Sequence, residues 1–204
     1  MSLGPCEIFE VGPRDGLQNE KREIPVAEKV ALVDKLSQAG FARIECASFV
    51  SPKWVPQMAG SGEVLEQISR AEGVRYAALT PNMRGYEDAL AAKADEIAIF
   101  ASASEGFSQK NINASIDEAF ERFAPILEQA RHVDIPVRGY VSCVVECPYD
   151  GKVDPGDVAR VADKLFAMGC YEISLGDTIG AGTPDSIARM LLSVRDVVPA
   201  GRLA

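Results

Sequence analysis

The sequence predicts an α/β fold of the (β/α)8 TIM-barrel type, with six βα units within its 204 residues. Three observations lead to this class. Short apolar segments alternate with longer helical segments along the chain. The apolar segments are nearly continuous, which is typical of parallel strands covered by helices on both faces. Polar residues follow almost every apolar segment, as in barrels whose chemistry lies at the carboxyl ends of the strands.

Six strands and six helices are expected in strict alternation. The strands span residues 6–11, 43–47, 74–79, 96–101, 137–144 and 171–176. The helices span residues 26–38, about 62–70, 82–93, 115–132, 155–168 and 184–197. A proline directly after Asp154 and another after Thr183 mark two helix starts, and a glycine such as Gly169 marks a helix end.

Domain organisation follows from the number of these units. An open, doubly wound sheet is the alternative to a barrel, but no Gly-x-Gly-x-x-Gly motif follows the first strand. A barrel of this type takes about 250 residues. We therefore expect residues 1–204 to form a single TIM-barrel domain that is incomplete at its C-terminus. We expect strands seven and eight to be missing, because the chain stops at "GRLA", where a seventh strand ought to begin.

Composition excludes several classes of partner. A formal charge of −9 and a pI near 4.7 argue against nucleic acid and anionic membranes, which both need a concentrated basic surface. No apolar run approaches the ~20 residues of a membrane span, and no signal peptide is recognised. The five scattered cysteines fit reduced intracellular thiols. We therefore expect a cytoplasmic protein.

Cys143 and Cys147 form the one close pair of cysteines. The spacing Cys-x3-Cys is a poor zinc signal here, because no second Cys or His pair accompanies it. We expect one thiol buried in a strand and the other in the following loop.

Arg14 and Asp15 stand side by side after the first strand, in "EVGPRDGLQNE". Arginine offers permanently charged, planar donors for an oxygen that gains negative charge, and aspartate offers an oxygen ligand for Mg²⁺ or Mn²⁺. A surface ion pair is an equally good interpretation from spacing alone. Glu45 lies within an apolar strand, where a carboxylate needs a partner, and Arg14 on the neighbouring strand is the natural one. The alternative is a glutamate at the exposed end of its strand.

Asp177 in "SLGDTIGAGTP" takes a similar place after the sixth strand, between glycines that permit a tight turn. Its alternative role is an N-cap for a short helical turn. The single histidine, His132, lies near a helix end and is not assigned to catalysis.

Several segments together carry a resemblance to a known family. They are "EVGPRDGLQNE", "ASFVSPKWVPQM", "LTPN", "KNIN", "RGYVSC" and "CYEISLGDTIGAGTP", in order over essentially the whole chain. The sequence thus resembles the hydroxymethylglutaryl-CoA lyases, which belong to the metal-dependent barrel lyases and Claisen condensing enzymes. Condensing enzymes share the Arg-Asp-Gly-x-Gln core but are not similar around Trp54, so the lyase is the specific interpretation.

The resemblance implies cleavage of 3-hydroxy-3-methylglutaryl-CoA to acetoacetate and acetyl-CoA. A divalent cation, Mg²⁺ or Mn²⁺, would polarise the tertiary hydroxyl. By the family's pattern Asp15 is a metal ligand, with the remaining ligands expected beyond residue 204. The catalytic residues would be Arg14, which stabilises the enolate, Glu45, which holds the arginine, and Asp177. The substrate-binding residues would be Gln18, Ser48, Tyr140 and Thr178.

The expected partner is therefore a small-molecule acyl-CoA, and we expect a homo-oligomer. Because one aspartate cannot hold a divalent ion tightly, the 204-residue chain alone is predicted to be inactive. The alternative function is that of an inactive fragment, which at most binds acyl-CoA or associates with itself through open sheet edges.

Overall fold

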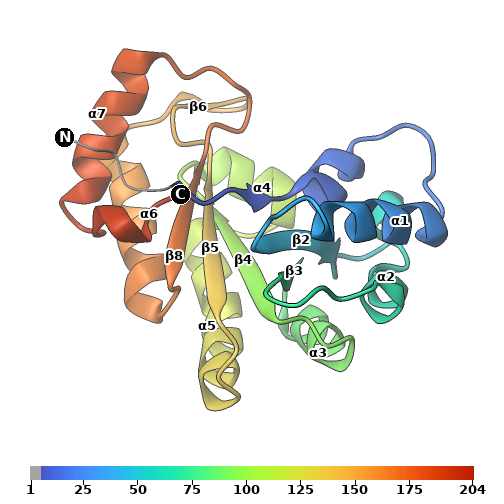
Figure 1. Cartoon of the computed structure of the whole chain (residues 1–204). Helices are drawn as coiled ribbons and strands as arrows, with labels where there is room; N and C mark the ends of the chain where they lie inside the picture. The colour runs from blue at the N-terminus through green and yellow to red at the C-terminus, as the bar shows by residue number, and fades with distance from the viewer. Residues whose placement is uncertain (1–5) are drawn as a thin grey trace. The chain divides into compact units, whose positions relative to one another are not determined.

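The computed structural model describes residues 6–204, and the chain divides into two compact units, residues 1–97 and 98–204 (Figure 1). In the described part of the chain, no helix has both the length and the apolar character that a membrane span requires.

The first unit contains three parallel strands in the order β1-β2-β3. Helices α1 and α2 both contact β2. The elements are β1 (Phe9–Glu10), η1 (Gly12–Gly16), α1 (Val26–Ser37), β2 (Arg43–Ser48), η2 (Pro56–Met58), α2 (Ser61–Gln67), β3 (Arg75–Leu79) and α3 (Met83–Ala91).

Strand β2 is the centre of the first unit's core. All six of its residues are buried, because β1 and β3 flank it in the sheet and α1 and α2 lie against it. Tyr76 of β3 is fully buried and donates its hydroxyl hydrogen to Ser37 of α1 over 2.8 Å. The apolar surface that these elements bury together fixes the position of β2, and with it the position of any side chain that β2 carries.

Strand β1 is shorter than the sequence predicts. The expected strand at residues 6–11 is reduced to two residues, and Ile8 before it is 65% exposed. The chain leaves the sheet because η1, a π-helical turn, begins at Gly12 directly after the strand. The predicted strands at 43–47 and 74–79 and the three predicted helices of this unit are confirmed to within a few residues at each end.

The second unit contains the parallel strands β4, β5 and β8, in that order, and a separate antiparallel hairpin of β6 and β7. Strand β4 starts on the last two residues of the first unit. The elements are β4 (Glu96–Ser102), α4 (Glu105–Ile112), α5 (Ile116–His132), β5 (Val137–Ser142), β6 (Glu146–Cys147), β7 (Gly151–Lys152), α6 (Pro155–Met168), β8 (Glu172–Gly176), α7 (Pro184–Arg195) and η3 (Ala200–Arg202).

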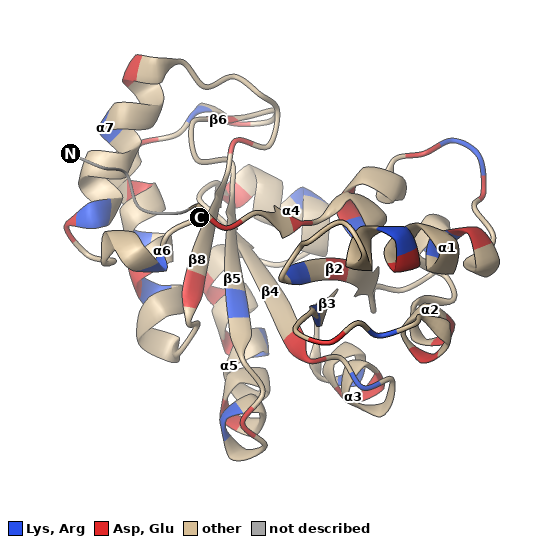
Figure 2. Ribbon diagram, viewed as in Figure 1, with Lys and Arg blue, Asp and Glu red and all other residues tan. Residues whose placement is uncertain are grey.

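Strands β5 and β8 are the best-defined pair of the second unit. They run in parallel register, and Arg138 at the start of β5 forms an ion pair with Glu172 at the start of β8. Figure 2 shows a blue band on β5 and a red band on β8, the colours of basic and acidic residues. Helix α6 packs against both strands and against α7. A Cβ atom on Gly139 would lie 3.1 Å from Cys170 Sγ and 3.2 Å from Leu165 Cδ1, so the missing side chain permits this close packing.

Helix α4, the β6–β7 hairpin and the short turn η3 of the second unit were not predicted. Ser104 is the N-cap of helix α4, and its hydroxyl accepts the Phe107 N–H over 3.1 Å, but the helix sequence "EGFSQKNI" lacks a clear apolar stripe. The β6–β7 hairpin turns at Asp150-Gly151, with Gly151 at φ +77°, a conformation that suits glycine. The hairpin's strands have two residues each and therefore no periodic pattern. The predicted strand at 137–144 consequently ends two residues early, at Ser142.

The last residues of the sequence lie parallel to β8. Leu203 pairs with Ile173, the Ala204 N–H donates to the Ile173 carbonyl over 2.9 Å, and the Leu175 N–H donates to the Ala204 carbonyl over 2.8 Å. Leu203 thus forms an isolated bridge beside β8, at the position where the sequence predicts a seventh strand to begin.

Candidate active site

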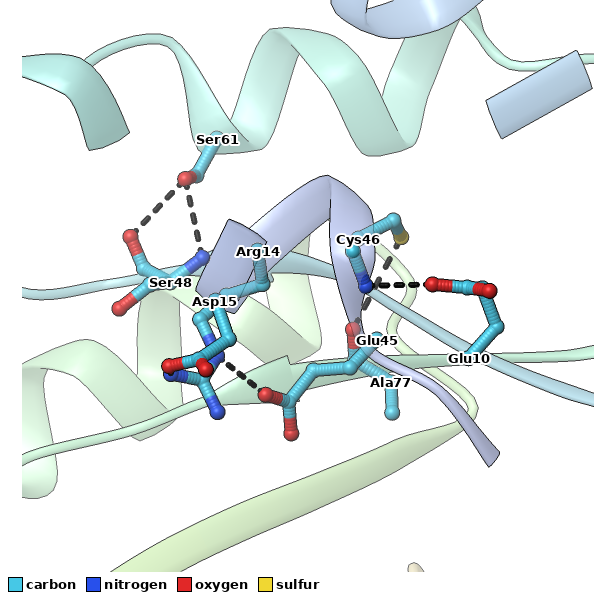
Figure 3. A network of polar contacts seen from close by, with 9 residues as sticks. Glu10, Arg14, Asp15, Glu45, Cys46, Ser48, Ser61 and Ala77 are labelled. Atoms are coloured by element: carbon cyan, nitrogen blue, oxygen red, sulfur yellow. Dashed lines mark hydrogen bonds and ion pairs between the residues drawn. The ribbon is translucent and has the colours of Figure 1, made fainter. Parts of the chain in front are cut away.

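A buried arginine and a buried glutamate form the centre of the first unit's polar cluster (Figure 3). Arg14 is 8% exposed and donates from Nε to Oε1 of Glu45, whose side chain is fully buried in β2. Its Nη1 lies 2.7 Å from Oδ1 of Asp15. The predicted partnership of Arg14 and Glu45 is therefore observed. The alternative of an exposed glutamate at a strand end is wrong for Glu45.

The turn η1 determines the direction of Arg14. The N–H groups of Arg14 and Asp15 both donate to the Val11 carbonyl, over 3.1 and 2.7 Å, and within this tight winding the two adjacent side chains are in contact. Glu10 accepts the Gly12 N–H at 2.5 Å, and a Cβ atom on Gly12 would lie 2.6 Å from the same carboxylate oxygen. Glycine at position 12 is thus required for the contact that braces the turn.

A register shift in β2 accompanies the Glu45 side chain. The pairing of β2 with β3 is irregular between Glu45 and Ala47, with Cys46 as the extra residue. Such bulges bend a strand locally and redirect a side chain. The irregularity lies at Glu45, the residue that holds Arg14. Sequence patterns do not reveal this irregularity.

Asp15 differs from Arg14 and Glu45 because its side chain is 62% exposed. A divalent cation needs several oxygen or nitrogen ligands. In residues 6–204 no group of three or more His, Cys, Asp or Glu side chains is gathered in a metal-binding arrangement. Asp15 as a metal ligand therefore stays a prediction.

Ser48, at the end of β2, is the predicted substrate-binding residue with the clearest local evidence. Its hydroxyl oxygen is buried and has no hydrogen-bond partner within residues 6–204. Its backbone is held by Ser61, whose hydroxyl accepts the Ser48 N–H over 3.0 Å and lies 2.9 Å from the Ser48 carbonyl (Figure 3). A fixed, buried hydroxyl without a protein partner is suited to a polar ligand atom. Gln18, another predicted residue, follows η1 and is half-buried.

A second set of contacts in the first unit holds the segment that follows η1. Gln57 accepts the Ile24 N–H over 3.0 Å and donates to the carbonyls of Glu20 and Arg22 over 3.1 and 2.8 Å. Lys29 donates to the Gln57 carbonyl, and burial lowers the pKa of its ammonium. These residues were missed because a glutamine and a lysine in a mixed sequence carry no pattern that distinguishes them from surface residues.

The remaining predicted residues lie in the second unit. Both carboxylate oxygens of Asp177 accept backbone N–H groups, from Ala181 at 3.1 Å and from Gly182 at 2.7 Å. Asp177 therefore braces its own loop. Thr178 accepts the Cys143 N–H over 2.8 Å. Tyr140 is half-buried in β5, with the Arg138 guanidinium 5.3 Å from its ring centre.

A further polar cluster of the second unit was not predicted. The Ser104 hydroxyl lies 2.6 Å from Asp150 Oδ2 and 2.9 Å from Cys147 Sγ. The Gly106 N–H also donates to Asp150, over 2.7 Å. Hydrogen bonds from Ser104 and Gly106 hold the pKa of Asp150 below its usual range. The expectation that Cys143 and Cys147 lie in a strand and a loop is wrong in detail. Cys143 follows β5, and Cys147 lies in β6.

Comparison with known proteins places this arrangement in a family. The HMGL-like family matches residues 6–204, which is nearly the whole chain. The chain belongs to the HMGL-like family. The 3-hydroxy-3-isohexenylglutaryl-CoA/hydroxy-methylglutaryl-CoA lyase of Pseudomonas aeruginosa is 60% identical over 97% of the chain. The chain spans 58–66% of the length of curated relatives such as this one.

Solved structures of HMGL-like proteins give the same result for the fold. The HMG-CoA lyase of Brucella melitensis matches with a TM-score of 0.94 and 59% identity, over 97% of this chain and 71% of that chain. An HMG-CoA lyase from Acinetobacter baumannii, solved in complex with coenzyme A and 3-methylmalate, matches with a TM-score of 0.92 and 33% identity, over 97% and 64%. The predicted fold class is thereby confirmed: this HMGL-like chain carries six βα units of the lyase barrel.

Proposed function

We propose that this chain forms the larger part of a lyase that cleaves 3-hydroxy-3-methylglutaryl-CoA to acetoacetate and acetyl-CoA. Membership of the HMGL-like family and 60% identity to a lyase with hydroxymethylglutaryl-CoA in its name support the reaction. The observation that carries the proposal is the buried Arg14, held by a fully buried Glu45 beside an exposed Asp15. A cation fixed in this way, away from bulk water, is suited to an oxygen that becomes negative during reaction.

Arg14 would act on the thioester oxygen of the substrate. Breaking the carbon–carbon bond leaves the electron pair on the acetyl-CoA fragment as an enolate, whose negative charge lies largely on that oxygen. A guanidinium already held in position stabilises this charge without reorganising when the charge appears. Because the enolate carries more charge than the thioester, the interaction is stronger in the transition state and raises kcat.

Glu45 would position Arg14 without touching the substrate. Removing a carboxylate and a guanidinium from water is costly, and the pair recovers that cost only with good geometry. A buried pair of this kind is therefore weak evidence for added stability. The arrangement supports a positioning role, in which Glu45 fixes the direction of the guanidinium plane.

Substrate contacts are proposed for four residues. Ser48 has the strongest support, because its buried hydroxyl finds no partner among the described residues. Gln18, Tyr140 and Thr178 are proposed on the family pattern. We propose that Asp177 serves catalysis by shaping its loop, because both of its oxygens accept backbone N–H groups.

A divalent metal, Mg²⁺ or Mn²⁺, is proposed as the cofactor, with Asp15 as one ligand. The exposed Asp15 carboxylate is a suitable hard donor, but the described residues do not gather the additional ligands. No chemical step is assigned to the metal for this reason. We propose that the 204-residue chain alone does not turn over.

The proposed partner is an acyl-CoA. The Acinetobacter baumannii relative binds coenzyme A together with 3-methylmalate, and this supports a CoA thioester as the substrate class. We also propose a homo-oligomer and a cytoplasmic location. One curated relative is named cytoplasmic, which is consistent with that location.

The proposal is tested with an extended chain. In this extended chain, the segment of the Pseudomonas aeruginosa lyase that follows its matched part is joined after Ala204. Acetoacetate release from 3-hydroxy-3-methylglutaryl-CoA is measured with and without Mg²⁺. We expect Mg²⁺-stimulated cleavage by the extended chain and none by the 204-residue chain. Condensation of acyl-CoA with a keto acid, without cleavage, would replace the lyase by a condensing enzyme.

A matched control separates chemistry from assembly. The segment of the Pseudomonas aeruginosa lyase is also assayed alone, and it should be inactive. An extended chain that folds, by circular dichroism, yet neither cleaves nor binds the CoA thioester would contradict the proposal. Mg²⁺-stimulated cleavage by the 204-residue chain would contradict the proposed need for further metal ligands.

A further inference from the structure

One buried side chain of the first unit, Gln57 in η2, holds the backbone of the loop between η1 and α1. Its Oε1 accepts the Ile24 N–H over 3.0 Å, and its Nε2 donates to the carbonyls of Glu20 and Arg22 over 3.1 and 2.8 Å. Gln57 is 7% exposed, and the loop that it binds lies 33 to 37 residues earlier in the chain. Both hydrogens of its amide nitrogen are used, so the orientation of the amide group is fixed.

Gln18, a proposed substrate-binding residue, lies between η1 and this loop. The Leu17 N–H donates to carbonyls within η1, so the chain continues directly from that turn. The Glu20 N–H donates to the Leu17 carbonyl over 3.0 Å and closes a turn around Gln18. Beyond it, residues 19–25 form no helix or strand and are mostly exposed. The bonds from Gln57 therefore hold the end of the turn that would otherwise move with an exposed loop.

The short helix η2 can support this loop because η2 is itself held against α1. The Lys29 ammonium of α1 donates to the Gln57 carbonyl and to the Ala59 carbonyl, the latter over 3.2 Å. A Cβ atom on Gly60 would lie 2.6 Å from Val26 Cγ2, so the chain after η2 lies directly against the start of α1. The loop enters α1 at the same place. These contacts fix the distance between the Gln57 amide and the loop.

The residues that follow η2 also hold the end of β2. The Ser61 hydroxyl accepts the Ser48 N–H over 3.0 Å, and it lies 2.9 Å from the Ser48 carbonyl and 2.9 Å from the Met58 carbonyl (Figure 3). Residues 56–61 thus contact the backbone on both sides of the candidate site, at Ser48 and at the turn around Gln18. Binding groups need to be held in this way, because a displacement of about 1 Å is enough to weaken a site.

We propose that Gln57 is a positioning residue of the active site, which keeps Gln18 in place by binding the backbone of the loop that follows it. This inference rests on the proposed function, in which Gln18 binds the substrate. Arg14 is held independently, by Glu45 and by the winding of η1. A residue that binds the substrate and the transition state alike lowers KM without raising kcat. Loss of Gln57 should therefore raise KM and leave kcat nearly unchanged.

Trypsin digestion of the folded 204-residue chain tests the contact with the loop without a lyase assay. Trypsin cleaves after Lys21 and Arg22, and the Arg22 carbonyl is one of the groups that Gln57 binds. Cleavage therefore requires the loop to open. Gln57→Glu keeps the size of the side chain and an acceptor for the Ile24 N–H but loses both donors. Cleavage after Lys21 and Arg22 should be about 10-fold faster in this variant, the scale of two lost hydrogen bonds.

Two controls separate opening of the loop from general unfolding. Gln67→Ala changes an exposed glutamine at the end of α2 and should leave every cleavage rate unchanged. Cleavage after Arg75, inside β3, reports unfolding of the first unit and should stay slow in Gln57→Glu. An unchanged rate after Lys21 and Arg22 would overturn the proposal. An equal rise in the rate after Arg75 would overturn it too, since Gln57 would then support the unit as a whole.

Steady-state kinetics of the extended chain tests the link between Gln57 and the substrate. Gln57→Glu and Gln18→Ala should each raise KM by about 10-fold and change kcat by less than about twofold. The double variant should have a KM close to that of either single variant, because Gln57 acts through Gln18. Effects on KM that multiply in the double variant would overturn the positioning role, and so would a loss of kcat at unchanged KM.

The two experiments distinguish failure of this inference from failure of the proposed function. If no version of the extended chain cleaves the CoA thioester, the proposed function fails, and the trypsin rates still decide whether Gln57 holds the loop. If the parent cleaves the thioester and its KM does not depend on Gln57, the positioning role fails and the proposed function stands.

Discussion

The two units stabilise their buried polar groups by different chemistry. In the first unit, Arg14 and Glu45 are both charged, and their contact joins a turn to a strand 31 residues further along the chain. In the second unit, Ser104, Cys147 and Asp150 form a hydrogen-bonded chain in which one group is neutral and two can titrate. The first arrangement pairs two opposite charges, whereas the second contains a thiol and a carboxyl, which can change their protonation states with pH. A charge held in place supports the proposed site for an enolate, whereas the Asp150 carboxyl makes the stability of the second unit depend on pH.

The largest expected effect belongs to Arg14. Arg14→Gln in the extended chain should lower kcat by about 100- to 1000-fold, the scale of one lost oxyanion donor, because a neutral amide replaces the cation that stabilises the enolate. KM should change much less, since the lost interaction is strongest in the transition state. Steady-state acetoacetate release measures both constants.

Arg22→Gln is the matched control for this substitution. Arg22 also pairs with a glutamate, Glu28, but both side chains are largely exposed. The kcat of the Arg22→Gln variant should stay close to that of the parent. Equal losses of kcat in the two variants would assign the effect to general charge and not to the site.

The next effect concerns the stability of the first unit. Glu45→Gln removes the buried carboxylate partner of Arg14 and leaves the more exposed Asp15 beside it. Loss of one member of a buried pair costs about 3–5 kcal/mol. Urea denaturation of the 204-residue chain should report this loss as a lower midpoint with an unchanged slope. The control is Glu28→Gln at the exposed pair of Arg22 and Glu28, where little change in the urea midpoint is expected. A Glu45→Gln variant with the urea midpoint of the parent would mean that water or another group compensates the charge of Arg14.

A smaller effect is expected in the second unit. A Cβ atom on Gly106 would lie 2.1 Å from Asp150 Oδ1, so Gly106→Ala must displace the Asp150 side chain. We expect destabilisation by about 1–3 kcal/mol, the range for overpacked sites. Gly201→Ala is the control, because nothing lies within 4 Å of its added carbon. If both variants melt at the same temperature, Asp150 moves aside without cost.

The smallest effect is the pH dependence that Asp150 brings. Its hydrogen bonds to Ser104 and Gly106 lower its pKa from the ordinary value of 3.8. A depressed carboxyl pKa stabilises the folded state above the unfolded value, and the contribution is lost as the pH falls through the folded pKa. Asp150→Asn should therefore have a lower melting temperature than the parent at pH 7. The gap between the two melting temperatures should narrow below pH 3.8. A constant difference over this range would contradict the depressed pKa.

Much of the fold could be predicted because long buried strands and capped helices leave periodic signals. The partnership of Arg14 and Glu45 could be predicted as well, because a carboxylate in an apolar strand needs a nearby cation. The turn η1 could not, since no sequence pattern distinguishes a π-helical turn from an ordinary loop.

The second unit's cluster was beyond prediction for a different reason. Ser104 and Asp150 are 46 residues apart, and both lie in segments without hydrophobic periodicity. Their contact depends on how α4 and the β6–β7 hairpin pack, which is a property of the tertiary structure. The same holds for Asp177, whose two backbone partners are set by the course of its loop.

The role of Arg14 is the central claim, and chemical rescue tests it most directly. Arg14→Ala in the extended chain removes the guanidinium but leaves Glu45 to bind a small replacement. Millimolar guanidinium chloride should restore part of the lost acetoacetate release, whereas urea, which has a similar shape without the charge, should not. An Arg14→Ala variant that cleaves the substrate as fast as the parent would contradict the account.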